Sequence, residues 1–244
     1  MDQFIEQHCS ATTIAVDLSD VQQRYASQLK LFDNELFAAD DYEQRNAASR
    51  TDGYWSYVAK GEDPPLENTY GEFPLPLFSA VVERGLQLAS LESDGATLLD
   101  LGSGAGRLVL WAAATERWQA IHGVELLPSL HAAAVEKLSA ASAMRFNILD
   151  HLELQTPSSA IKLHLGSWDD DALLPWDTLD VCFAYATAFD HDANGVLVAL
   201  SAALRERLKA GCIVCTTDYR LGDGFEVLET LAGVNDGVSW LYAW

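Results

Sequence analysis

One short stretch constrains the fold of this chain more than any other: an apolar run followed at once by alternating glycines. Residues 97–101 form the run, and the glycines are Gly102, Gly104 and Gly106. An alanine-rich helical pattern then begins at Leu108. A buried parallel strand, a tight turn and a helix in this order are typical of the nucleotide-binding corner of a doubly wound α/β sheet. Glycine allows the backbone to turn tightly and to approach a ligand closely.

Two acids at the ends of neighbouring predicted strands indicate which ligand this corner takes. Asp100 stands just before Gly102, where a carboxylate would repel a dinucleotide pyrophosphate but attract the ammonium and sulfonium groups of S-adenosylmethionine (SAM). Glu125 ends the next apolar run, about 20 residues beyond the glycines, where an acid accepts ribose hydroxyls. We therefore expect SAM as the cofactor. The alternatives are two incidental acids beside a glycine turn, or an NAD-dependent oxidoreductase, which Asp100 disfavours.

The charge of the chain bears on its partners. The 244 residues include 36 acids against 15 Lys and Arg, a formal net charge of −21. Nucleic-acid binding needs a basic surface, so we expect no direct contact with DNA or RNA. Basic proteins or cationic ligands would be attracted, although plain solubility also explains such a charge. No window has the ~18 apolar residues of a membrane helix, and the acidic start favours neither a secretory signal nor a transit peptide. The expected compartment is the cytoplasm or the nucleus.

The cysteine and histidine patterns do not indicate a metal site. The four cysteines are Cys9, Cys182, Cys212 and Cys215. Cys212 and Cys215 fall in a predicted strand, where residues three apart point to opposite faces and cannot chelate one ion together. We expect buried free thiols. The six histidines show no paired helical spacing, so no metal is predicted.

Two helical segments are predicted before the glycine turn. Ser19 begins a capping-box pattern. An apolar stripe at steps of three and four residues follows it: Val21, Tyr25, Leu29, Phe32 and Leu36. A second helical stretch covers about residues 40–60. Residues 1–65 are therefore expected to form a helical cap, which either shapes a substrate entrance or simply packs on the core.

The rest of the chain alternates strands and helices and then ends in two strands. This order predicts a mostly parallel, seven-stranded sheet with an antiparallel C-terminal hairpin. Ligands of such sheets bind at the carboxyl ends of the strands. The expected helices are 75–89, 108–116, 128–141 and 194–209, and the expected strands are 97–101, 120–125, 161–165, 179–184, 212–217, 225–231 and 238–244.

The glycine turn together with Gly123–Glu125 resembles a class I SAM-dependent methyltransferase. The upstream segment Thr69-Tyr70-Gly71-Glu72 is similar to the cofactor-covering loop of the non-SET histone lysine methyltransferases, the disruptor-of-telomeric-silencing family. Gly237–Trp240 resembles the last hairpin of that family. The resemblance covers residues 66–244 and implies a Rossmann-like methyltransferase domain there, preceded by the cap.

The chain also departs from this family. The family carries two asparagines before Phe-Ala-Phe, and they help to line the channel through which lysine reaches the methyl group. Tyr185 and Ala186 replace them here, ahead of Phe189. The basic nucleosome-binding extension is missing as well. The resemblance therefore carries the fold and the cofactor further than it carries the histone substrate.

The resemblance implies a role for each matching residue. Asp100 would take the methionine ammonium of SAM and Glu125 the ribose. Ser167 would reach the adenine amine, and Trp168 would pack on the ring unless it is an ordinary core residue. The remaining cofactor contacts would come from the turn (Gly102, Ser103, Gly104, Gly106) and from the covering loop (Tyr70, Gly71, Glu72). Glu72 is otherwise an ordinary acid in a first helical turn.

The expected activity is transfer of a methyl group from SAM to a protein, on lysine, which leaves S-adenosylhomocysteine. Tyr185, Phe189 and Tyr219 would border the acceptor, and taken singly each also fits a plain core aromatic. Methyl transfer is an in-line displacement that depends on orientation, so we name no catalytic base. The alternatives are a small-molecule methyltransferase and a SAM-binding protein without catalysis. The expected protein partner is basic, and the oligomeric state stays open.

Overall fold

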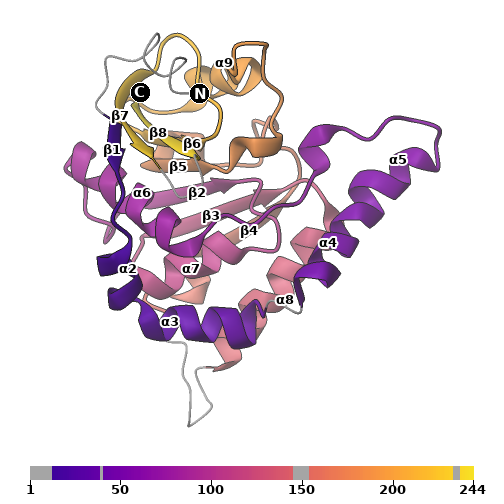
Figure 1. The fold of residues 1–244 in the computed structure, drawn as a ribbon, viewed down its shortest axis with the longest axis horizontal. Coiled ribbons are helices and arrows are strands. Elements are labelled where there is room, and N and C mark those ends of the chain that lie inside the picture. The colour runs from indigo at the N-terminus through magenta and orange to yellow at the C-terminus, as the bar shows by residue number, and fades with distance from the viewer. Residues whose placement is uncertain (1–12, 39–40, 145–153, 233–236) are drawn as a thin grey trace.

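The computed structural model describes residues 13–38, 41–144, 154–232 and 237–244 of the chain. Within these residues one eight-stranded sheet runs through the molecule in the order β1-β7-β8-β6-β5-β2-β3-β4 (Figure 1). Its strands are β1 (Thr13–Ala15), β2 (Thr97–Leu101), β3 (Ala120–Glu125), β4 (Ile161–Leu165), β5 (Val181–Ala184), β6 (Ile213–Thr217), β7 (Glu226–Ala232) and β8 (Val238–Ala243).

The strand directions confirm a mostly parallel sheet with an antiparallel C-terminal hairpin. β4, β3, β2, β5 and β6 are parallel neighbours, and β8 runs antiparallel between β6 and β7. The sheet has one strand more than the predicted seven, because β1 pairs in parallel with β7. The Thr13 and Thr230 hydroxyls lie 2.9 Å apart across this pair. Three residues are too short to show a strand periodicity, so this part of the expected helical cap was predicted wrongly.

The helices cover both faces of the sheet. α6, α7 and α8 pack on one face together with the N-terminal helices, and α9 packs on the other (Figure 1). The α-helices are α2 (Ser19–Arg24), α3 (Ala26–Leu31), α4 (Tyr42–Arg50), α5 (Ser56–Val58), α6 (Leu75–Ala89), α7 (Arg107–Thr115), α8 (Pro128–Met144) and α9 (Val198–Arg207). Short π or 3-10 turns are η1 (Phe32–Leu36), η3 (Thr51–Trp55), η4 (Leu66–Asn68), η5 (Ser158–Ala160), η6 (Trp176–Thr178) and η7 (Ala186–Ala188).

Most predicted elements form with small differences at their ends, and two predictions need correction. Ser19 caps no helix: it lies inside α2, and its N–H donates to Asp17 Oδ1 at 2.9 Å. α9 begins at Val198 rather than Asn194, because the Asp192 carboxylate accepts the Asn194 and Val196 N–H groups and holds a turn there.

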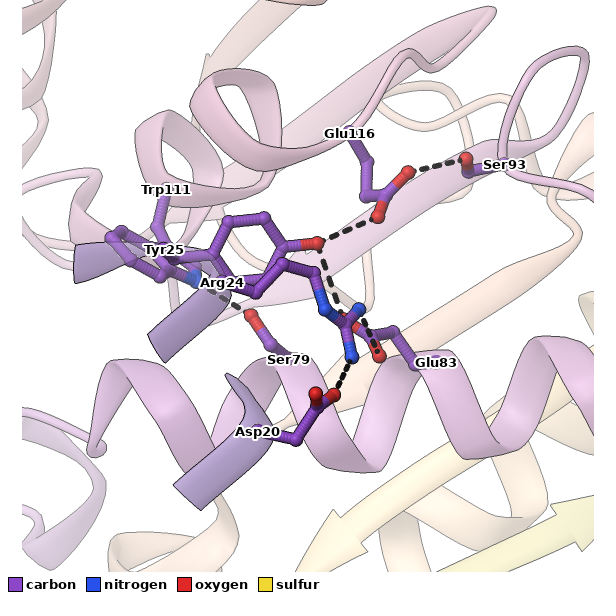
Figure 2. A network of polar contacts seen from close by, with 8 residues as sticks. All are labelled: Asp20, Arg24, Tyr25, Ser79, Glu83, Ser93, Trp111 and Glu116. Carbon is purple, nitrogen blue, oxygen red and sulfur yellow. Dashed lines mark hydrogen bonds and ion pairs between the residues drawn. The ribbon is translucent and has the colours of Figure 1, made fainter. Parts of the chain in front are cut away.

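The predicted apolar stripe attaches the N-terminal helices to the body. Tyr25 and Phe32 both meet the buried Trp111 of α7 edge-on, with ring centroids 5.8 and 5.2 Å apart. Polar contacts surround this packing (Figure 2). The Tyr25 hydroxyl donates to Glu116 at 2.9 Å, and Arg24 donates to Glu83 at 2.9 Å. Tyr25, at the junction of α2 and α3, and Phe32 of η1 therefore join the N-terminal helices to the core.

The structure describes three of the four cysteines and most of the possible metal ligands. Cys182, Cys212 and Cys215 are buried and free, and Cys212 and Cys215 pack in clusters on opposite faces of the sheet. Burial raises the pKa of the Cys182 thiol well above its ordinary value. Cys9 lies outside the described residues. Among those residues, no three His, Cys, Asp or Glu side chains gather as metal ligands. No helix within them has the length and apolarity to cross a bilayer.

The network of Figure 2 predicts a stabilising role for one hydroxyl. Tyr25→Phe removes the hydrogen bond to Glu116 but keeps the ring on Trp111. We expect a loss of about 1 kcal/mol of unfolding free energy in urea titration. Tyr54→Phe is the matched control, because Tyr54 is 45% exposed, and it should change nothing. Equal stability of the two variants would contradict the prediction.

Candidate functional site

The glycine turn is bonded directly to the end of the neighbouring strand. The N–H groups of Gly102 and Ser103 both donate to the Val124 carbonyl, at 3.0 and 2.9 Å. Gly102 and Gly104 have φ values of +74° and +55°, a region that side-chain-bearing residues rarely adopt. The turn therefore sits against the carboxyl end of β3, where the predicted ligand-binding edge lies.

A cavity of about 330 Å³ opens at this edge. It is lined by the residues before α6 and by four segments at the carboxyl edge of the sheet: the glycine turn, the end of β3, and the segments after β4 and β5. Nine of the residues predicted from the sequence line it: Tyr70, Gly71, Gly102, Gly104, Glu125, Ser167, Trp168, Tyr185 and Phe189.

A second hollow of about 30 Å³ adjoins the first. The two share the lining residues Tyr70, Gly71, Gly102, Gly104 and Tyr185. The smaller hollow adds three more of the predicted residues, Glu72, Asp100 and Ser103. The structure therefore brings both predicted acids to one continuous site.

Two predicted residues lie elsewhere. Gly106 lines neither hollow: it caps α7, and a Cβ there would lie 3.0 Å from the Cβ of Ala134 on α8. Its small size serves the contact between helices. Tyr219 is absent from both linings too, and its ring stacks on His191 at a centroid separation of 3.6 Å. Its suggested place beside the acceptor stays a prediction.

Asp100 is a buried carboxyl group in the lining of the smaller hollow. Its side chain is buried, and Oδ2 has no hydrogen-bond partner in the part of the chain that the structure describes. Burial, and secondarily the charge of Glu125, raise the pKa of Asp100 to about 7. Burying an unpaired carboxylate costs free energy, so this group is suited to a cationic ligand.

Glu125 is held more firmly. Its Oε2 accepts the N–H of Gly104 at 2.8 Å and its Oε1 accepts the N–H of Leu127 at 2.7 Å. Burial raises the pKa of Glu125, and these N–H donors oppose that shift. Each oxygen keeps a second lone pair, so the fixed carboxylate can still accept hydroxyl groups of a ligand.

The segment of residues 69–73, here called the cover loop, lies over the glycine turn. A Cβ on Gly104 would lie 2.8 Å from the Tyr70 ring, and one on Gly71 would lie 3.2 Å from the Tyr185 ring. Glu72 accepts a hydrogen bond from the Tyr70 hydroxyl at 2.6 Å. Burial and the Glu72 carboxylate raise the pKa of Tyr70, which keeps its hydroxyl protonated as the donor.

Arg107 is a site residue that the sequence analysis missed. It is the first residue of α7 and lines the smaller hollow beside Asp100. Its Nη1 donates to the Phe73 carbonyl at 2.9 Å, while its buried Nε has no hydrogen-bond partner among the described residues and lies 3.6 Å from Glu72. Burial lowers the pKa of Arg107. The sequence signal that could have identified this residue is a cationic side chain directly after Gly106.

Comparison with known families decides what this site belongs to. The family described as "Histone methylation protein DOT1" matches residues 63–218, which is more than half of the chain. The chain belongs to this family. It is a class I methyltransferase, and SAM is its cofactor.

The fold is shared with a solved rRNA methyltransferase structure. The rRNA methyltransferase aviRa from Streptomyces viridochromogenes is 15% identical with a TM-score of 0.54, and the match covers 80% of this chain and 92% of that one. An RNA methyltransferase from Salinibacter ruber, crystallised with S-adenosyl-L-homocysteine, is 21% identical with a TM-score of 0.49, covering 71% of this chain and 93% of that one. No curated protein sequence matches.

Aromatic side chains line the cavity of this DOT1-family chain. Tyr185 lies against Phe73, with ring centroids 5.2 Å apart, and Trp168 faces Phe189 at 6.4 Å. Ala186 is buried, and its N–H donates to the Thr217 hydroxyl at 3.2 Å. Asp169 and Asp190 are exposed and also line the cavity. The site thus combines an apolar wall with acids at its rim.

The raised pKa of Asp100 predicts a pH-dependent cost in stability. An acid whose pKa rises from 3.8 unfolded to about 7 folded destabilises the fold increasingly between these values, and fully above the upper one. In urea titrations without cofactor at pH 7.5, the free energy of unfolding of Asp100→Asn should be higher than that of the wild type by at least about 1 kcal/mol. The difference should be smaller at pH 4.

The control for this comparison is Asp94→Asn, because the Asp94 side chain is 76% exposed. That variant should follow the wild type at both pH values. A stability difference between Asp100→Asn and the wild type that does not grow with pH would contradict the assigned shift.

Proposed function

We propose that this methyltransferase transfers the methyl group of SAM to a lysine of a basic protein. The placement of SAM in this proposal rests on a pair of buried, incompletely partnered groups in the smaller hollow. Asp100 offers a carboxylate oxygen and Arg107 a guanidinium N–H, and both lack hydrogen-bond partners among the described residues. An α-amino acid carries the complementary ammonium and carboxylate, and SAM ends in such a group.

With the amino-acid end of SAM in the smaller hollow, the rest of the cofactor would lie in the larger cavity. Glu125 would accept the ribose hydroxyls, and Ser167 and Trp168 would hold the adenine in the larger cavity. The smaller hollow is about the size of one water molecule. When bound, SAM supplies an electrophilic methyl group.

The chain's own contribution to the reaction is orientation and exclusion of water. Holding a nucleophile in line with the reacting bond is worth about 7–11 kcal/mol. A lysine must be neutral to react, and the walls formed by Tyr185 and Phe189 disfavour the ammonium form by desolvation. These residues would border the acceptor, and no side chain is assigned as a catalytic base.

Charge supports a basic acceptor. The chain has a net charge of −21, and Asp169 and Asp190 are exposed on the cavity lining. Such a rim attracts a cationic side chain and repels a phosphate backbone. The rRNA methyltransferase aviRa therefore supports the fold without supporting an RNA acceptor. The description of the family favours a nuclear protein as the acceptor.

An apolar surface beside the cavity supports a macromolecule over a small molecule. Four large apolar side chains are exposed on η3, α5 and η4: Tyr54, Trp55, Val58 and Leu66. α5 projects from the body of the molecule (Figure 1). Gly53 of η3 packs against Asn68 and Leu127, which line the cavity. Exposed aromatic patches commonly mark contact surfaces for other proteins.

The acceptor class is tested with SAM that carries a tritiated methyl group. The protein is incubated with core histones, intact nucleosomes, total soluble protein and a protein-free metabolite extract. We expect label in a protein band, on lysine by mass spectrometry. Asp100→Ala should lower it at least about tenfold, since a charged hydrogen bond is lost. Asp94→Asn should leave it unchanged. Label in the metabolite pool alone would contradict a protein acceptor, and SAM binding without label in any pool would favour a non-catalytic protein.

The role of Arg107 is tested by binding alone. Arg107→Met should weaken SAM at least about tenfold, the effect of losing a charge-assisted hydrogen bond. It should hardly change the affinity for 5′-methylthioadenosine, which lacks the amino-acid end. Arg117→Met is the control, because the Arg117 side chain is 71% exposed. Calorimetric titration gives both affinities, and equal losses for the two ligands would contradict this assignment.

A further inference from the structure

A buried arginine outside the family match reaches the cover loop. Arg45 lies in α4, and the DOT1 match begins only at residue 63. We propose that Arg45 is a positioning residue for cofactor binding: it holds Glu72, and through Glu72 it keeps the cover loop on the glycine turn. This inference rests on the proposed placement of SAM in the two hollows.

The contacts form a short chain from the N-terminal helices to the glycines. Arg45 Nε donates to Glu72 Oε1 at 2.7 Å. The same oxygen accepts the Tyr70 hydroxyl at 2.6 Å, and the Tyr70 ring covers Gly104. Arg45 thus acts on the turn through two intervening residues and touches neither hollow itself.

Burial distinguishes this ion pair from an ordinary surface contact. The side chains of Arg45 and Glu72 are 5% and 16% exposed, and Arg45 lies over the Phe37 ring at 5.5 Å. Its Nη1 is buried without a hydrogen-bond partner in the described part of the chain. Burying a guanidinium costs more free energy than burying an apolar side chain of similar size. An apolar side chain would be enough to attach α4 to the body, whereas fixing the Glu72 carboxylate in place needs a positive charge.

The position of Glu72 matters because a second cation lies nearby. Glu72 Oε2 is 3.6 Å from Arg107 Nε, too far for a hydrogen bond. While Arg45 holds the other oxygen, Arg107 Nε stays available for the cofactor. Without Arg45, the carboxylate, which already forms an ion pair with Arg107, is free to move closer and accept a hydrogen bond from its Nε. The loss would then both loosen the cover loop and occupy the group that takes the cofactor carboxylate.

The test uses S-adenosylhomocysteine, whose binding needs no acceptor. Arg45→Met should weaken it at least about tenfold, the effect of losing one charge-assisted hydrogen bond, and should speed its dissociation by a similar factor. Arg45→Lys keeps the charge and should recover part of the loss. Calorimetry gives the affinity, and stopped-flow displacement gives the rate.

The matched control is Arg24→Met. Arg24 also joins an N-terminal helix to the body by an ion pair, with Glu83, but neither residue lines either hollow. The Arg24→Met variant should be less stable in urea than the wild type but should bind S-adenosylhomocysteine with unchanged affinity. A double-mutant cycle with Glu72→Gln should be strongly non-additive, because both substitutions break one contact. If Arg45→Met fails to fold, Arg45→Lys and Glu72→Gln carry the comparison.

The outcomes separate this inference from the function beneath it. Wild-type protein that does not bind S-adenosylhomocysteine would overturn both. Wild-type binding with unchanged affinity and dissociation rate in the Arg45 variants would overturn the positioning role alone. Weaker binding in Arg45→Met and normal binding in Arg24→Met would establish it.

Discussion

The structure depends on the close contact between the glycine turn and the end of β3. Gly102 and Ser103 donate to the Val124 carbonyl, and Gly104 donates to the Glu125 carboxylate. Gly123 makes this contact possible, because a Cβ there would lie 2.8 Å from Ser103 Oγ and from a Val109 methyl group. One set of backbone bonds therefore shapes the turn, orients one acid and leaves Asp100 buried with an open oxygen. The two hollows are a consequence of that geometry.

The N-terminal segment completes this site although it lies outside the family match. Its first helices are fixed to the core by aromatic packing on Trp111 and by the contacts of Tyr25 (Figure 2). α4 then lies beside α8 (Figure 1) and places Arg45 against Glu72 of the cover loop. Helices that look like a separate cap in the sequence thus share contacts with both the core and the site.

Fold and acceptor rest on different kinds of observation. The sheet order and the glycine turn are common to methyltransferases of many acceptors, so they do not identify the substrate. The proposed acceptor rests instead on surface properties: the acidic rim at Asp169 and Asp190, the aromatic walls, and the exposed apolar side chains around Trp55. The replacement of the family's paired asparagines by Tyr185 and Ala186 leaves a wall that is more apolar and less able to donate hydrogen bonds.

The sequence alone determined the sheet type, the glycine turn and the two acids, because each depends on neighbours within a few residues. An apolar run, glycines at alternate positions and an acid at a strand end are local patterns, and strand ends meet at one edge in any parallel sheet. Tertiary structure decided the rest. β1 is a strand only because the edge of β7 is available to it, and Gly106 serves a helix contact because Ala134 lies opposite. Arg107 and Arg45 gain their roles from Glu72, which lies 35 and 27 positions away along the chain. Charges paired across such distances leave no periodic signal, since only folding brings them together.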